Sequence, residues 1–247
     1  MWESSRTPCL GLVRLALAVA LAVALTVAPV SSAEVPPTDA ESACGEGAGL
    51  AAAHRIQARY DEIRDLAGRF TQTNESSTFG GEPLMSPEQK TGGVVFAKPG
   101  KMRWTYEAPE RSVVVSNGNT LWLYDVEGRT VTQLAVTAGF LSGAALQFLL
   151  GDGKILESFE VRAAACSAGR ITLDLLPKAE STYERLGLLA DAETGEILAT
   201  SVLDLFGNLT MIEFADVVVN RDPDRALFEF EAPEGVEVIE YDGSPTS

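Results

Sequence analysis

Histidine, cysteine and basic residues are scarce in this chain of 247 residues, and each shortage excludes a class of function. The single histidine excludes zinc sites of the HExxH type and any mechanism that needs two imidazoles. The 19 Lys and Arg against 35 Asp and Glu give a formal net charge of −16, which argues against binding to nucleic acid or to anionic lipid through a basic patch. Three cysteines are too few for a disulfide-dense scaffold, whereas a hydrophobic content of 46% predicts a folded core.

The first 33 residues have the pattern of a secretory signal peptide. Arg6 and Arg14 supply a positive start, residues 15–28 form an apolar run, and Ser31-Ser32-Ala33 offers small residues for cleavage. The apolar run is shorter than the roughly 20 residues that a membrane-spanning helix needs. We therefore expect an exported chain that is cleaved near Ala33.

Two cysteines, Cys44 and Cys166, remain after cleavage, in a compartment where disulfides form. The sequence leaves open whether they are bonded, because it does not show that the two sulfurs meet. Residues 34–49 mix Pro, Asp, Glu and Gly without a period and indicate a flexible lead-in. From Leu50 to Ala67 apolar residues recur at spacings of three and four, which predicts an amphipathic helix.

The remainder of the chain, within a single predicted domain over residues 50–247, alternates short β-type runs with turn signals. Consecutive strands joined by such short turns are antiparallel neighbours, and a sheet of about 11 strands must curl or close. The fold class that we expect is mostly β with helices, an incomplete antiparallel barrel. The predicted strands are Arg69–Phe79, Gly92–Ala97, Lys101–Glu107, Ser112–Asn117, Thr120–Asp125, Thr130–Val136, Leu156–Ala165, Arg170–Leu176, Tyr183–Asp191, Glu196–Leu205, Leu209–Val218 and Leu227–Glu231.

A second amphipathic helix is predicted inside this series of strands, over residues 137–151, with Phe140, Leu141, Phe148 and Leu149 in its apolar stripe. Several strands are apolar on both faces, as in Val113-Val114-Val115 and Leu121-Trp122-Leu123. Such strands need cover on both sides or an apolar ligand. Two helices that supply all the cover and a true cavity remain equal alternatives, and the inward face of the valine run stays open.

Catalytic and metal-binding motifs are weak in this sequence. It contains no GxSxG elbow and no P-loop, and neither Cys44 nor Cys166 has a His and Asn arrangement typical of a nucleophile. We therefore expect neither an enzyme nor a bound cofactor or metal.

One long motif resembles a known family. The motif begins with residues 92–107, which contain the run Lys98-Pro99-Gly100-Lys101-Met102-Arg103-Trp104-Thr105-Tyr106. It continues through Pro109 and residues 114–125. The whole motif is similar to the central motif of the outer-membrane lipoprotein carrier family, LolA. Phe70-Thr71-Gln72 and Phe228-Glu229-Phe230 are similar to the family's first and last strands.

The resemblance implies a half-barrel with a helical lid, in a periplasmic monomer that holds the acyl chains of lipoproteins in an apolar cavity. It also implies an inner-membrane ABC transporter and an outer-membrane receptor as partners. In that family an arginine before the proline holds the lid closed; here the position is Lys98, which keeps the charge but loses the planar fork of donors. The acyl-binding residues that we expect are Phe70, Phe96, Met102, Trp104, Val114, Leu121, Leu123, Phe140, Leu141, Phe148 and Leu149.

The favoured hypothesis is thus a carrier whose acidic exterior keeps it off anionic membranes while its interior shelters lipid. The alternatives are an envelope lipid-binding sensor or scaffold module that does not shuttle cargo, and a structural β protein with a filled core.

Overall fold

The computed structural model describes residues 44–45, 47–79, 82–83, 86–136 and 153–241. The predicted signal peptide and the predicted helix over residues 137–151 lie outside the described residues.

The main helix, α1 (Ala48–Glu62), is amphipathic and buries Ala52, Ala53, Ile56 and Tyr60. It ends earlier than the sequence pattern predicts, so the expectation of helix through Ala67 is wrong. Ile63 has extended backbone angles, and the chain from Asp65 onward forms strand β1. The hydrogen bonds of β1 to two neighbouring strands outweigh the local helical spacing of its apolar residues.

The strands follow in the order that the turns predict, with three short additions. The elements are β1 (Asp65–Glu75), β2 (Thr78–Phe79), β3 (Glu82–Pro83), β4 (Glu88–Ala97), β5 (Lys101–Ala108), β6 (Ser112–Asn117), β7 (Thr120–Asp125), β8 (Thr130–Ala135), α3 (Ile155–Ser158), β9 (Phe159–Ser167), β10 (Arg170–Pro177), β11 (Tyr183–Asp191), β12 (Ile197–Asp204), β13 (Leu209–Val219), the 3-10 helix η1 (Arg225–Phe228) and β14 (Glu237–Tyr241).

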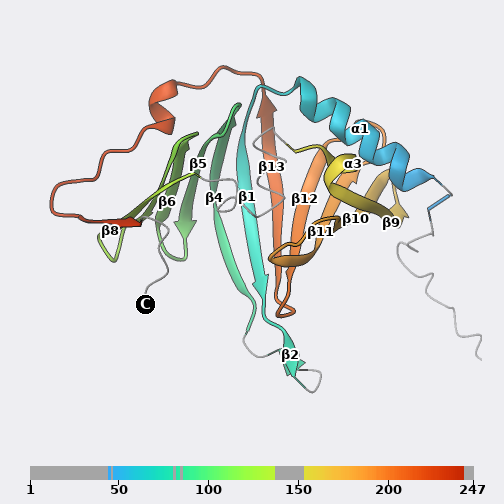
Figure 1. Cartoon of the computed structure of the whole chain (residues 1–247), viewed down its shortest axis with the longest axis horizontal. Helices are drawn as coiled ribbons and strands as arrows, with labels where there is room; N and C mark the ends of the chain where they lie inside the picture. The colour runs from blue at the N-terminus through green and yellow to red at the C-terminus, as the bar shows by residue number, and fades with distance from the viewer. Residues whose placement is uncertain (1–43, 46, 80–81, 84–85, 137–152, 242–247) are drawn as a thin grey trace, which may run out of the picture. The chain divides into compact units, whose positions relative to one another are not determined.

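Twelve of these strands form one open sheet in the order β14-β8-β7-β6-β5-β4-β1-β13-β12-β11-β10-β9 (Figure 1). The predicted incomplete antiparallel barrel is confirmed, since β14 and β9 are free edges and all neighbours except β14 and β8 are antiparallel. Strand β1 lies in the middle. It joins what we call the first half-sheet, β4–β8, to the second half-sheet, β9–β13.

The C-terminal segment departs from the prediction. The strand expected over Leu227–Glu231 is wrong, because residues 225–228 form η1. The Asp224 carboxylate caps this helix, since its Oδ1 accepts the Ala226 N–H at 2.9 Å. The segment then continues to β14, a strand that the sequence analysis did not predict and that pairs in parallel with β8. Figure 1 shows the segment passing from β13 around the first half-sheet to its far edge.

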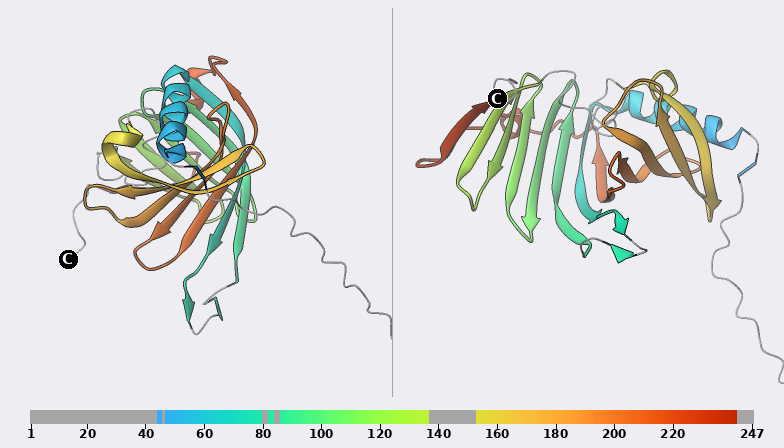
Figure 2. Two further views of the ribbon diagram at one scale, coloured as in Figure 1. Left: turned by 90° about the vertical axis from the view of Figure 1, so that its right-hand side faces the viewer. Right: turned by 60° about the horizontal axis from the view of Figure 1, so that its bottom comes forward.

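The two faces of the sheet are covered by different elements. We call the face on which α1 packs the inner face; α1 contacts β9 and β10, and α3 contacts α1 and β9 (Figures 1 and 2). On the outer face of the first half-sheet, Phe230 stacks on Trp122 and Tyr124 at 6.3 and 5.6 Å between ring centroids. Phe228 is buried in the same segment, and Arg103 Nη1 donates to the Leu227 carbonyl at 3.3 Å.

A disulfide, a close backbone approach and the Arg59–Glu196 ion pair at 3.0 Å tie α1 to the second half-sheet. A disulfide joins Cys44, just before α1, to Cys166 in β9, with 5.2 Å between the Cα atoms. Gly195, in the turn between β11 and β12, has a φ of +71° and lies against the backbone of Arg55, where a Cβ would come within 3.0 Å. This turn therefore requires glycine both for its backbone angle and for the approach of the helix.

Candidate functional site

A cluster of aromatic rings lies on the inner face where β1, β4 and β5 pair. The Trp104 ring lies 4.5 Å from that of Phe70 and 5.8 Å from that of Phe96, and the Tyr106 ring lies 5.1 Å from that of Phe70. Gly92 makes room for them, because a Cβ there would lie 2.8 Å from the Phe70 ring and 1.9 Å from the Thr105 carbonyl oxygen. Strand alternation therefore gathers these rings on one side of the sheet.

The register extends this apolar surface across the first half-sheet. Trp104 is opposite Val114, and Val114 is opposite Leu123. Alternation along these strands puts Val114, and neither Val113 nor Val115, on the inner face, which answers the question that the sequence left open. Met102, Ser116, Leu121 and Leu134 form the next row.

A groove of about 440 Å³ opens on this surface at the end of the strands where β5 meets β6. Val114, Leu123 and Tyr106 supply its apolar part. Its polar wall consists of Gln72, Lys90, Glu110, Arg111, Ser112, Asp125, Thr130 and Thr132, and Val113 and Tyr124 complete the lining. We call it the mouth groove. A lining that joins apolar and polar side chains is suited to a ligand with an apolar chain and a polar end.

Two polar groups lie among the aromatic rings, one on Tyr106 in the lining of the groove and one on Trp104 beside it. The Tyr106 hydroxyl donates to Gln72 Oε1 at 2.9 Å, and burial raises the pKa of Tyr106 to about 12, so the phenol is neutral. The indole nitrogen of Trp104 is buried and makes no well-formed hydrogen bond among the described residues, and it lies close enough to the Tyr106 hydroxyl to offset part of the rise in the pKa of that group. It is therefore a donor that a ligand carbonyl could satisfy.

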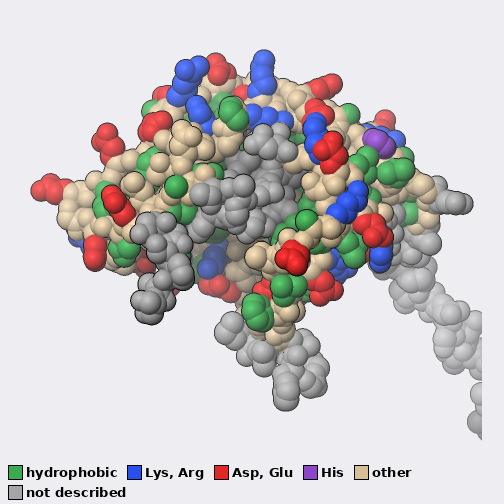
Figure 3. All heavy atoms as spheres, viewed as in Figure 1, with side chains coloured by type: hydrophobic (Ala, Val, Ile, Leu, Met, Phe, Trp, Pro, Cys, Tyr) green, Lys and Arg blue, Asp and Glu red, His purple; other side chains and the backbone are tan. Residues whose placement is uncertain are grey.

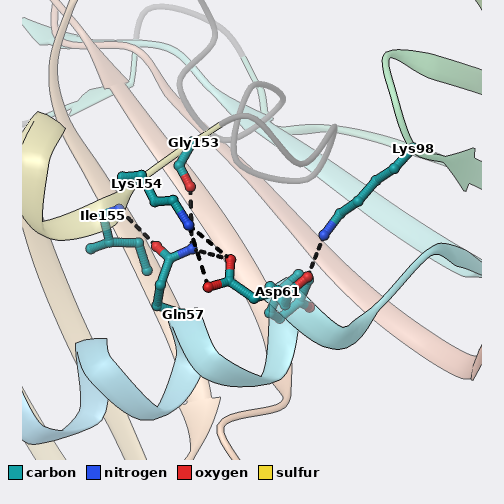
Figure 4. Close-up of polar contacts among 7 residues, drawn as sticks. Gln57, Asp61, Lys98, Gly153, Lys154 and Ile155 are labelled. Carbon is teal, nitrogen blue, oxygen red and sulfur yellow. Dashed lines mark hydrogen bonds and ion pairs between the residues drawn. The ribbon is translucent and has the colours of Figure 1, made fainter.

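The Lys98 side chain reaches from the turn between β4 and β5 to the end of α1 (Figure 4). Its ammonium donates to the Tyr60 carbonyl oxygen in the last turn of the helix. A cation is favoured there, because the carbonyls of the last helical turn have no partner within the helix.

A second polar contact holds α1 to residues 153–155 (Figure 4). Gln57 Nε2 donates to Asp61 Oδ1 at 2.8 Å and to the Gly153 carbonyl at 3.3 Å, and the Ile155 nitrogen donates to Gln57 Oε1 at 2.9 Å. Lys154 pairs with Asp61 at 3.3 Å. The hydrogen bond from Gln57, followed by Lys154, lowers the pKa of the Asp61 carboxyl. We call Gln57, Asp61 and Lys154 the helix clasp.

Among the residues expected at the site, five lie together in the buried core: Phe70, Phe96, Met102, Trp104 and Leu121. Val114 and Leu123 are partly buried and line the groove. The remaining four, Phe140, Leu141, Phe148 and Leu149, lie outside the described residues.

Sequence reasoning missed several residues that the fold brings to the site. Tyr106 could have been found, because it alternates with Met102 and Trp104 along one strand. Gln72, Lys90 and the helix clasp come from distant positions and gave no local signal, apart from the spacing of four between Gln57 and Asp61.

No helix within the described part of the chain is long and apolar enough to cross a membrane. Within the same residues, no group of three or more His, Cys, Asp or Glu side chains is arranged to hold a metal ion.

The sequence matches the family model described as outer membrane lipoprotein carrier protein LolA over residues 61–231. An outer-membrane lipoprotein carrier protein of Methylococcus capsulatus is 33% identical over 192 residues, which cover 75% of this chain and 86% of that protein. The protein of the same name from Alkalilimnicola ehrlichii is 30% identical over 95% of this chain and 99% of its own length.

Solved structures with a similar arrangement include a LolA superfamily protein from Nitrosomonas europaea and an uncharacterized conserved protein from Thermus thermophilus. The first has a TM-score of 0.41 and 12% identity, covering 72% of this chain and 97% of that one. The second has a TM-score of 0.47 and 11% identity, covering 76% and 99%.

Proposed function

The chain belongs to the outer membrane lipoprotein carrier family, LolA, and from this membership and the geometry of the inner face we propose that it carries lipoproteins by sheltering their acyl chains on the inner face of the first half-sheet. The observation that carries the proposal is the mouth groove, whose lining joins the apolar side chains of Val114 and Leu123 to a set of polar side chains. Carriage of this kind needs binding and release and no chemical change in the cargo.

The energetics suit a reversible carrier. Each acyl methylene that leaves water contributes about 0.8 kcal/mol, so a partly sheltered chain gains several kcal/mol. The Trp104 indole N–H, buried without a well-formed hydrogen bond among the described residues, would donate to an ester or amide carbonyl at the head of an acyl chain. Such a bond would favour lipid with a carbonyl over a plain hydrocarbon.

Release requires that the site can return to a state without cargo. In our proposal Lys98 is the latch that holds α1 over the inner face, through its bond to the Tyr60 carbonyl. A lysine makes this contact through one ammonium, whereas a guanidinium would offer a fork of donors to several carbonyls at once.

The place of action follows from the signal-like N-terminus and the family. We propose that the mature chain works in the periplasm as a monomer, receives cargo from an inner-membrane ABC transporter and passes it to an outer-membrane receptor.

The experiment that tests acyl binding uses one lipoprotein in two forms, triacylated and without its acyl chains, in detergent-free buffer. We expect a soluble complex with the acylated form alone, measured by co-elution in size-exclusion chromatography. Equal binding of both forms, or no complex with either, would overturn the proposal.

A second experiment separates a carrier from a lipid-binding sensor or scaffold. Depletion of the protein in cells should leave lipoproteins in the inner-membrane fraction if it shuttles them. Unchanged localisation after depletion, together with acyl binding in vitro, would favour the sensor instead.

A further inference from the structure

A second groove, of about 530 Å³, lies at the opposite end of the strands from the mouth groove. The mouth groove includes Lys90 and Tyr106, whereas this one includes Ala97 and Lys101, at the other ends of β4 and β5. Asp222, Pro223, Arg225 and Phe228 of the segment after β13 form its other wall. Lys and Arg side chains gather along this edge at the top of Figure 3.

The lining of this groove is cationic although the whole chain is strongly acidic. Arg64, Lys98, Lys101 and Arg225 face two carboxylates, Asp65 and Asp222, in a chain of net charge −16. We call these four the basic groove residues. Among the described residues, Arg64, Lys101 and Arg225 take part in none of the ion pairs. Their charges are thus available to an anion.

One of the two carboxylates, that of Asp65, already accepts hydrogen bonds from the backbone. Asp65 is 7% exposed, and its oxygens accept the backbone N–H groups of Arg221 at 2.7 Å and Asp222 at 3.2 Å. Its role is to hold the segment after β13 against the start of β1. Only Asp222 then presents an exposed carboxylate to the groove.

The walls that carry the cations are fixed to each other by backbone contacts. Asn220 donates from its backbone to the Asp65 carbonyl at 2.9 Å, and its side-chain oxygen accepts the Arg64 N–H at 2.8 Å. Lys98 is held by the Tyr60 carbonyl. Cations on fixed walls lose less conformational entropy when they bind than cations on a free loop would.

We propose that this groove binds the phosphate group of an anionic phospholipid. Phosphate is the anion that clustered Arg and Lys side chains bind best, since the guanidinium offers paired donors and the ammonium a compact charge. The choice of a lipid source rests on the proposed function, because a carrier of lipid-anchored cargo must approach a membrane surface.

Binding at the basic groove residues would run against the expectation that net charge alone decides contact with anionic membranes. Net charge predicts that the protein stays off anionic membranes, but charges separated by more than about 8 Å are screened at physiological salt. A local cluster can therefore bind a headgroup while the distant acidic residues contribute little. The four cations come from positions 64, 98, 101 and 225, so the cluster exists only in the folded chain.

The test measures sedimentation of the purified protein with two kinds of vesicle, phosphatidylcholine alone and phosphatidylcholine with phosphatidylglycerol. We expect binding only to the second. The double variant Lys101→Gln/Arg225→Gln should bind it about 30-fold more weakly, since each basic residue near such a surface contributes about a factor of five. The matched control is Arg162→Gln/Arg170→Gln, which removes the same charge from exposed positions on β9 and β10 and should bind like wild type.

Each other outcome overturns the proposal. Equal binding of the groove variant and wild type, with both folded by circular dichroism, would show that the groove is not the site. Wild type that sediments equally with both kinds of vesicle would show that binding does not depend on an anionic headgroup, and wild type that binds inorganic phosphate in calorimetry but neither kind of vesicle would show that the ligand is free phosphate instead of lipid.

Failure of the phospholipid site can be distinguished from failure of the carrier proposal by a second measurement. The same variants are tested for complex formation with the triacylated lipoprotein in vesicle-free buffer. If vesicles do not bind while the lipoprotein does, the phospholipid site is wrong and the carrier stands; if the lipoprotein fails to bind, the carrier proposal falls whatever the vesicles show.

Discussion

The two half-sheets use the same strand pattern, but their inner faces have different environments. In the second half-sheet Leu173 and Leu188 are 0% and 1% exposed, and α1 covers the neighbouring strands. In the first half-sheet Met102 and Leu121 are as well buried, at 3% exposed each, and the difference lies along the mouth groove, where Val114 and Leu123 are only partly buried. The segment that holds Phe228 and Phe230 covers the outer face of the first half-sheet instead.

This difference separates stability from binding within one sheet. Apolar residues under α1 are fixed by close packing, where loss of a methylene leaves a cavity. Apolar residues along the mouth groove have a free side, so they can contact a ligand without a loss of core packing. Mutations in the second half-sheet should therefore change stability, and mutations along the groove should change binding.

The largest expected loss of stability comes from removal of the disulfide that fixes α1 to the second half-sheet. Cys44 and Cys166 are separated by 122 residues. In the chain-entropy model, a bridge over a loop of this order contributes about 4–5 kcal/mol. The variant Cys44→Ser/Cys166→Ser should lose stability of this order in urea unfolding. Wild type treated with reductant should behave like the variant, and an unchanged midpoint would contradict the expectation.

Leu173→Ala should have the next largest effect. Leu173 is fully buried in β10, and truncation of a buried leucine costs about 3 kcal/mol, because apolar contacts are lost and a cavity remains. We expect the folded fraction to bind acyl chains as wild type does. A large fall in acyl affinity measured on fully folded protein would show that the second half-sheet is also part of the binding surface.

Leu123→Gln should weaken binding of acyl chains, in contrast to Leu173→Ala, which should lower stability. The change puts an amide among the apolar side chains of the mouth groove, so we expect about tenfold weaker binding of an acyl-chain dye. Its matched control is Leu189→Gln in β11, a partly buried position on the outer face of the second half-sheet, which should leave dye affinity unchanged. If both variants bind dye equally, the two half-sheets do not differ in the way that we describe.

The sequence predicts the strands and their antiparallel order well, because alternation and short turns are local signals. Met102, Trp104 and Tyr106 share a face for the same reason. The end of α1 was missed, since apolar spacing near Leu66 suits a helix and a strand alike, and hydrogen bonds to β4 and β13 decide between them. Strand β14 was missed because its partner β8 lies about a hundred residues earlier in the chain.

The site was predictable in part. Phe70, Phe96 and Trp104 belong to a motif that can be read in the sequence, and the fold brings their rings together. The mouth groove and the basic groove depend on register and on the path of the C-terminal segment, so residues such as Lys90 and Arg225 meet their neighbours only in three dimensions. Local sequence patterns do not predict such long-range contacts.

The smallest expected loss of stability comes from changes in the helix clasp. They test whether the charge of Asp61 contributes to holding α1 against residues 153–155. Because the pKa of Asp61 is lowered below its ordinary value of 3.8, the contact stabilises the folded chain above that value and is lost as pH falls through the lowered pKa. The pair is exposed, so Asp61→Asn should cost at most about 0.5 kcal/mol at neutral pH.

The wild type and Asp61→Asn should therefore unfold at different urea concentrations at neutral pH and at the same concentration once the carboxyl is protonated. Lys154→Gln gives the partner control, and in the double variant the two effects should not add, since either change removes the same ion pair. A difference that persists in acid would mean that Asp61 contributes through something other than its charge, because the protonated carboxyl and the asparagine amide are both neutral and both keep an acceptor for Gln57. In that case the helix clasp holds α1 to residues 153–155 without a contribution from the Asp61 charge, and the charged contact between α1 and the second half-sheet is the Arg59–Glu196 ion pair at 3.0 Å.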